Sequence, residues 1–227
     1  MQTYSKQYCY KKINIADKDV ITEELLQNDY DGVRLEVSSS CEVDKTLLHE
    51  NQYICVDRTI KAKISLGAIE GLDRLVRMDV RCLPGISEEV YEIARKAFKK
   101  DRRFFLTPDC DEELGHIVLG DYIKQLEMVE KLVFGCFYQD EPVGVLVAIK
   151  ISETEYETVL GAILPEWQSK GAGMSLYAFE FGELQRRGVR TLYSRISTDN
   201  VSSLNLHISL SKGRIQFIQP LDVYIKG

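Results

Sequence analysis

The chain has 227 residues, of which 44% are hydrophobic and 28% are charged, the composition of an ordinary folded protein rather than of a long disordered segment. Its formal net charge of −6 argues against a general nucleic-acid binder, because neutralising phosphates requires a clustered lysine and arginine surface. No apolar run approaches the roughly 20 residues that a helix needs to span a bilayer, so we expect no membrane partner.

The beginning of the chain and its cysteines bear on where the protein resides. Residues 1–6 are polar, so no signal peptide is predicted. The six cysteines occur singly, without a C-x-x-C pair, and their spacing fits neither a zinc site nor a small disulfide framework. We therefore expect reduced thiols, no bound metal and a cytoplasmic location.

Residues 1–70 are predicted to form a small α/β lobe in which short helices and strands alternate. Its expected elements are helices at 17–27 and 42–50, a strand at 33–37, and extended chain at 53–66 with a break near Asp57-Arg58. Gly67 and Gly71 flank a weakly patterned stretch, which is typical of a boundary. A second domain is therefore expected over residues 74–227.

From residue 74 onward the hydrophobic pattern predicts a mixed α/β domain. Residues 76–82 alternate apolar and charged side chains, the period-two pattern of a half-buried strand. Ser87 can cap the next helix, and a second helix at 112–129 is expected to be interrupted or bent near Gly120. The remaining expected elements are strands at 132–138, 143–151, 157–164 and 191–196, a turn at 139–142, a helix from Gly171 to the C′ residue Gly188, a helix from Thr198 to Ser211, and a final strand. The class is mixed α/β with a largely antiparallel sheet.

A glycine-containing loop, Gln168-Ser-Lys-Gly171-Ala-Gly173, joins a predicted strand to a predicted helix. The unpaired N–H groups and the positive dipole end of that helix favour a phosphate, and Lys170 adds positive charge. The string is neither a P-loop nor a dinucleotide-binding fingerprint. A plain glycine turn is the alternative interpretation.

Polar side chains also follow one face of the last predicted helix. Asn200, Ser203 and His207 recur at i, i+3 and i+7, beside an apolar stripe of Val201, Leu204 and Ile208. Such a stripe is typical of a solvated helix surface. Because this helix follows the next strand after the loop, the stripe is also placed where it can face the phosphate loop across a cleft.

These residues match a known family. The run at 168–173 resembles the Q/R-x-x-G-x-G/A signature of GCN5-related N-acetyltransferases (GNAT), including the preceding proline, here Pro165. The run at 200–207 resembles that family's last helix, in which tyrosine commonly occupies the position of His207. The resemblance covers about residues 74–227. It implies the GNAT fold, a mixed and mostly antiparallel central sheet flanked by helices, with the smaller α/β lobe added at the N-terminus.

The resemblance also implies acetyl-CoA as the cosubstrate and no metal. The loop amides would hold the pyrophosphate, while the end of the preceding strand and the last helix would contact the pantetheine arm. The residues implied to bind the cosubstrate are Ala162, Ile163, Leu164, Gln168, Ser169, Lys170, Gly171, Ala172, Gly173, Met174, Asn200 and Ser203. His207 is expected to be the general acid that protonates the leaving thiolate. The general base stays open among Glu157, Glu166, the acids at 109–111 and a chain of water molecules.

A looser likeness concerns the acceptor. The N-terminal lobe and Arg103-Phe104 resemble the TDP-fucosamine acetyltransferase type, which implies the primary amine of an amino-sugar nucleotide as acceptor, with Arg103 and Tyr122 binding it. Two alternatives remain. The acceptor could be another amine of a peptide, polyamine or aminoglycoside, or the chain could be a non-catalytic acyl-CoA-binding module. A homodimer is a further expectation.

Overall fold

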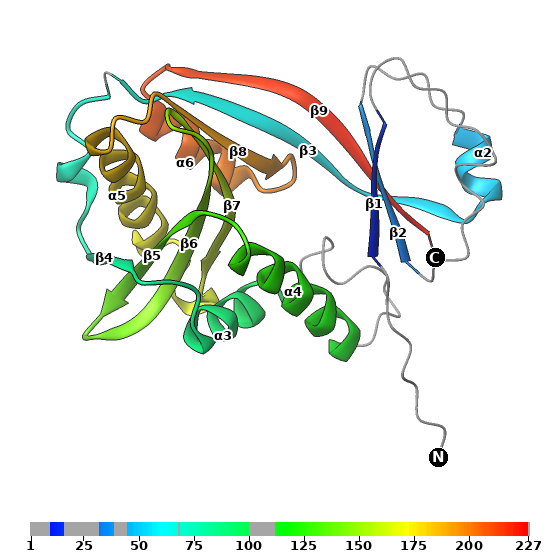
Figure 1. Cartoon of the computed structure of the whole chain (residues 1–227), viewed down its shortest axis with the longest axis horizontal. Coiled ribbons are helices and arrows are strands. Elements are labelled where there is room, and N and C mark those ends of the chain that lie inside the picture. The colour runs from blue at the N-terminus through cyan, green and yellow to red at the C-terminus, as the bar shows by residue number, and fades with distance from the viewer. Residues whose placement is uncertain (1–9, 16–31, 39–44, 68, 100–111, 227) are drawn as a thin grey trace.

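The computed structural model describes residues 10–15, 32–38, 45–67, 69–99 and 112–226 (Figure 1). The helix expected at 17–27, the acids at 109–111 and Arg103 lie outside the described residues. The strands are β1 Tyr10–Ile15, β2 Gly32–Ser38, β3 Tyr53–Ser65, β4 Asp79–Leu83, β5 Lys131–Tyr138, β6 Glu141–Ser152, β7 Glu155–Ile163, β8 Thr191–Ser197 and β9 Ile215–Lys226. The helices are α2 Lys45–Glu50, α3 Glu88–Ala97, α4 Glu112–Glu127, α5 Ala172–Arg186 and α6 Val201–Ser211, with short 3₁₀ turns η1 Asp73–Leu75 and η2 Pro165–Trp167.

Within the described residues one sheet of nine strands forms the centre of the molecule, in the order β1-β2-β9-β3-β8-β7-β6-β5-β4. Two neighbouring pairs, β1 with β2 and β7 with β8, are parallel, and the other neighbours are antiparallel. Helices α3 and α4 lie on one face and α5 and α6 on the other (Figure 1). The predicted fold class, a mostly antiparallel mixed sheet flanked by helices, is confirmed.

The strand β3, which belongs to the first 70 residues, lies between β8 and β9 in this sheet. Figure 1 shows β3 and β9 side by side, running from the body of the molecule out to β1, β2 and α2. The β3–β9 register shifts between Cys55 and Asp57, where the sequence predicts a break in the extended chain. The division into lobes at residues 70–74 stays a prediction, but β3 is hydrogen-bonded into the same sheet as the strands that follow it.

Two details differ from expectation. Helix α4 continues without interruption through Gly120, so the break predicted there is wrong. A Cβ on Gly120 would stand 3.4 Å from the Tyr91 hydroxyl of α3, which indicates that glycine allows the close contact of two helices. The hairpin between β5 and β6 turns on Gln139 and Asp140 alone, with φ of 51° and 64°, a two-residue turn that matches the strand twist.

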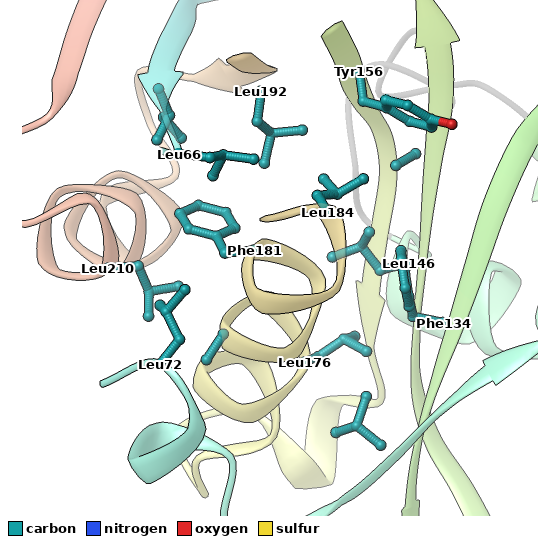
Figure 2. Close-up of a cluster of buried hydrophobic side chains, with 14 of the residues drawn as sticks. Leu66, Leu72, Phe134, Leu146, Tyr156, Leu176, Phe181, Leu184, Leu192 and Leu210 are labelled. Atoms are coloured by element: carbon teal, nitrogen blue, oxygen red, sulfur yellow. The ribbon is translucent and has the colours of Figure 1, made fainter. Parts of the chain in front are cut away.

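The core is divided by the sheet into two apolar clusters. Figure 2 shows the cluster on the α5 side, where Phe181 and Leu176 of α5 pack among side chains of the sheet and of α6. A second cluster lies between the sheet and α3 with α4. Full burial of such a side chain contributes roughly 1.5–3 kcal/mol, so these two layers fix the helices on the sheet. None of the described helices has the length and apolar character needed to cross a membrane.

Candidate functional site

The parallel strands β7 and β8 separate part of the way along their length. They pair over four positions, from Glu155 opposite Thr191 to Thr158 opposite Ser194, and not beyond. On its other edge β7 remains paired with β6 up to Ile163. Residues 159–163 therefore present an extended backbone with one free edge toward β8. We call this opening the fork. A free strand edge can accept an extended ligand as an added strand.

The cause of the fork is visible in the register of β7. The pairing of β7 with β6 shifts between Thr158 and Leu160, so Val159 is the extra residue of a bulge, and bulges bend and twist a strand. The carbonyl of Val159 accepts a hydrogen bond of 2.7 Å from the hydroxyl of Tyr122 on α4. Tyr122, expected from the resemblance to bind the acceptor, thus contacts the backbone at the point where the strands part.

The loop at 168–171 follows η2 directly after β7 and is exposed to solvent. Ser169 and Gly171 both have positive φ, 64° and 87°, which turns the chain sharply onto α5. The side-chain amide of Gln168 donates to the carbonyl of Ile163 at 3.2 Å and so ties the loop to the end of β7. The Lys170 ammonium lies 5.0 Å from the centre of the Trp167 ring.

The N-terminus of α5 is uncapped by any side chain. Helix geometry leaves the N–H groups of Ala172, Gly173 and Met174 without a partner inside the helix. These donors, the positive end of the helix dipole and Lys170 lie together beside the end of β7, an arrangement that favours an anion. The predicted phosphate loop is therefore present with its strand-loop-helix context, and its role as a pyrophosphate site stays a prediction.

Two α5 side chains face the fork. Tyr177 lies against Gly161 of β7, since a Cβ on Gly161 would overlap the Tyr177 hydroxyl. One turn later, Glu180 accepts a hydrogen bond of 2.6 Å from the Thr158 hydroxyl through Oε1. The other oxygen, Oε2, is buried and has no hydrogen-bond partner among the described residues. Burial raises the pKa of the Glu180 carboxyl to about 8, against the opposing effect of the Thr158 bond, so the group is neutral near pH 7.

Neither Tyr177 nor Glu180 was predicted from the sequence as a site residue. The spacing of Tyr177 from Phe181 and Leu184 places it on the apolar face of α5, so periodicity alone assigns it to the core. The available signal for Glu180 was its position between Leu176 and Leu184 in a row with a spacing of four residues, where an acid interrupts an otherwise apolar stripe.

His207 of α6 is fully buried. Its Nδ1 lies 2.8 Å from the carbonyl oxygen of Ser203, and since a carbonyl only accepts, Nδ1 carries the hydrogen. The other nitrogen, Nε2, then presents a lone pair, and within the part of the chain that the structure describes it has no hydrogen-bond partner. Burial lowers the pKa of His207 to about 4, so the imidazole is neutral at physiological pH. Its ring meets the Tyr177 ring edge-on at a centroid distance of 5.0 Å.

The polar stripe of α6 is thus turned inward at His207, while part of the neighbouring apolar stripe faces solvent. Val201 and Ile208 are 60% and 46% exposed. Asn200 caps the helix, its Oδ1 accepting from the Ser203 N–H at 3.0 Å. The pantetheine contacts expected of Asn200 and Ser203 stay predictions.

Two of the candidate general bases, Glu157 and Glu166, lie among the described residues. Glu157 forms an ion pair of 2.9 Å with Lys61, and Glu166 lies in η2 beside the loop. Neither position decides the base. Among the residues that the structure describes, no group of three or more His, Cys, Asp or Glu side chains could hold a metal ion.

Comparisons with known proteins bear on the fold. Searches against protein-family models and among curated proteins found no match. Among solved structures, a conserved protein of unknown function from Staphylococcus epidermidis aligns with a TM-score of 0.59 at 14% identity, over 86% of this chain and 72% of that one. A protein from Novosphingobium aromaticivorans described as a GNAT-family acetyltransferase aligns with a TM-score of 0.54 at 14% identity, over 89% and 77%.

A GCN5-related N-acetyltransferase from Sphaerobacter thermophilus aligns with a TM-score of 0.56 at 16% identity, over 86% of this chain but only 59% of that one. Identities this low show the fold alone. The chain has the GNAT fold, as the sequence resemblance implied. The TDP-fucosamine type stays a prediction.

Proposed function

We propose that the chain is an acyl-CoA-dependent N-acyltransferase that moves an acetyl group from acetyl-CoA to a primary amine by direct transfer. The observation that carries this proposal is the fork between β7 and β8. Its open end lies beside the uncapped N-terminus of α5, and its Gly161 contacts Tyr177, whose ring packs against the buried His207. The proposed anion site at one end suits the pyrophosphate of acetyl-CoA. The free strand edge that runs away from it suits the amide-containing pantetheine arm.

The binding roles follow from this arrangement. The amides of residues 171–174 and Lys170 would bind the pyrophosphate, with Gln168 and Ser169 shaping the loop. The free edge of β7 at Ala162 and Ile163, continued by Leu164, would pair with the pantetheine amides, and Asn200 and Ser203 would contact the arm from α6.

The chemistry forms a C–N bond and breaks the thioester C–S bond. Backbone N–H groups on the free edge of β7 would polarise the thioester carbonyl. The attacking amine loses one proton and the departing thiolate gains one. His207 was expected to supply this proton, but it is a neutral imidazole whose Nε2 presents a lone pair. We therefore assign it the role of proton carrier, which takes the proton from the amine before releasing it to the thiolate.

The proposed acceptor is the amine of an amino-sugar nucleotide, with Arg103 and Tyr122 binding it, and another amine is the alternative. One observation favours an acceptor that carries phosphate or carboxylate. Arg195 of β8 lies one residue beyond the last paired position of the fork, on the face opposite Ile196 and therefore on the face of α4. Among the described residues its guanidinium makes two long contacts, 3.4 Å to Thr59 Oγ1 and 3.5 Å to the Gln219 carbonyl, a loose pairing that suits the binding of an anion.

An assay of thiol release tests the proposal. Acetyl-CoA would be incubated with the protein and with a sugar-nucleotide amine, a polyamine, an aminoglycoside or a peptide, and free CoA thiol would be measured. We expect turnover with at least one amine, a lower kcat for His207→Gln, and an unchanged dissociation constant for acetyl-CoA in that variant. Tight binding of acetyl-CoA without turnover on any amine would favour the non-catalytic binding module instead.

A further inference from the structure

The closed end of the fork is polar. Thr158 and Ser194 are the last paired residues of β7 and β8, and strand alternation places both side chains on the α5 face, together with Ile196 and Tyr156. They are 5% and 4% exposed, and Glu180 lies over Thr158. A buried acid and two hydroxyls therefore line the position where the two strands part.

One carboxyl oxygen of Glu180 is left without a hydrogen bond to the described residues. Its Oε1 is held by the Thr158 hydroxyl, whereas Oε2 is buried without a partner. With Thr158 donating to Oε1, the proton of the neutral carboxyl lies on Oε2 and forms a donor. Its neighbours at four residues' spacing, Leu176 and Leu184, belong to the apolar cluster of Figure 2 and offer no acceptor.

A purely structural role explains this group poorly. Buried polar atoms in native proteins are nearly always paired, and an unpaired one calls for an explanation such as a ligand. A leucine would continue the row of Leu176 and Leu184 without leaving any polar atom unpaired. Glu180 lies where a pantetheine arm bound on the free edge of β7 would end. We infer that an atom of the bound ligand accepts the hydrogen bond that Oε2 can donate.

We propose that Glu180 determines acyl specificity, its Oε2–H donating to an oxygen that a short acyl group carries beyond the thioester carbonyl. This inference rests on the proposed function and extends its acyl donor from acetyl-CoA to short hydroxyacyl- or ketoacyl-CoAs, which the site would bind more tightly than an unsubstituted acyl-CoA of the same length. The Glu180–Thr158 contact lies one residue, about 3.3 Å of strand, from the first free position of β7, so an acyl oxygen that reaches Oε2 from a thioester on this edge would be only a few carbons beyond the carbonyl.

Matched acyl-CoAs of one chain length test the proposal. Butyryl-CoA, 3-hydroxybutyryl-CoA and CoA itself would be titrated calorimetrically into the wild-type protein, Glu180→Gln and Glu180→Leu. We expect the wild type to bind 3-hydroxybutyryl-CoA about tenfold or more tightly than butyryl-CoA. Glu180→Gln keeps a donor and should retain most of this ratio, whereas Glu180→Leu should reduce it to unity or reverse it, with CoA affinity unchanged.

Glu183→Gln is the matched control, because Glu183 lies on the same helix but pairs with Arg186 and Arg187 near the surface. It should leave the ratio unchanged, and circular dichroism would verify that each variant is folded. Equal wild-type affinities for the two acyl-CoAs, or a ratio that survives in Glu180→Leu, would overturn the inference while CoA binding upholds the proposed function. Absence of CoA binding in the folded wild type would overturn both.

Discussion

The hydroxyl of Tyr177 occupies the space that a side chain at position 161 would need. A Cβ added to Gly161 would overlap this oxygen, and the ring carbon that bears it would be 3.1 Å away. Gly161 lies on the free edge of β7 and Tyr177 on α5, whose N-terminus is the proposed anion site. The contact therefore fixes the distance between the two elements that we propose to hold acetyl-CoA.

Gly161→Ala should displace the Tyr177 ring. We expect a loss of about 1–3 kcal/mol in the free energy of unfolding, as for other overpacked sites, and weaker binding of acetyl-CoA. Denaturant unfolding and calorimetry measure the two effects. Adding Tyr177→Phe removes the overlapping oxygen and should restore part of the stability. Gly67→Ala is the control, since a Cβ there meets nothing within 4 Å. Equal effects at both glycines would contradict the packing argument.

Tyr122→Phe removes the donor to the Val159 carbonyl at the bulge. We expect a loss of about 0.5–1.5 kcal/mol in the free energy of unfolding and a lower affinity for acetyl-CoA, because the bulge sets the course of the free edge. Tyr91→Phe is a matched control that removes a similar bond, 3.2 Å to the His116 carbonyl, between α3 and α4. It should cost stability without changing the affinity. If Tyr91→Phe lost affinity for acetyl-CoA and Tyr122→Phe did not, the role given to Tyr122 at the bulge would be wrong.

Glu180 should make the protein less stable as the pH rises. Its pKa is raised to about 8 in the folded state, above its unfolded value, so the unfolded chain releases the proton first. The contribution of the neutral carboxyl is complete below about pH 4.5 and is lost progressively as the pH approaches 8, by at most about 1.4 kcal/mol per pH unit. Urea unfolding of the wild type and Glu180→Gln at pH 5, 6.5 and 8 measures the difference. If the free energy of unfolding of the wild type differs from that of Glu180→Gln by the same amount at all three pH values, Glu180 is not a neutral buried acid.

His207 should act in the opposite direction. Its pKa is lowered to about 4 in the folded protein, so the unfolded chain binds a proton first as the pH falls. The contribution of the neutral imidazole is present above about pH 6.5 and is lost between there and pH 4. Relative to His207→Gln, the wild type should therefore lose stability on acidification. An NMR titration in which the His207 ring of the wild type protonates near pH 6.5 would contradict this prediction. It would restore His207 as the imidazolium acid that the sequence predicts.

Local patterns predicted the parts of the structure that local forces determine. The periodicity of α5, the loop before it and the C′ glycine Gly188 with φ of 81° were readable because each depends on residues close in sequence. The position of β3 between β8 and β9 was not, since it depends on pairing between residues at least 126 positions apart. The contacts of Glu180 with Thr158 and of His207 with Tyr177 were not readable either, because each joins residues of two different elements that only the packed fold brings together.

Calorimetric titration of acetyl-CoA into the wild type, Gly173→Glu and Gly182→Glu tests the central claim most directly. Both variants add one carboxylate to α5, but position 173 lies in its first turn, at the proposed pyrophosphate site, and position 182 lies near its other end, where a Cβ meets only Arg186 at 3.7 Å. We predict clear binding to the wild type and Gly182→Glu, and loss of binding in Gly173→Glu, because the added charge repels phosphate. Binding that persists unchanged in folded Gly173→Glu, or that is absent from the folded wild type, would contradict the account.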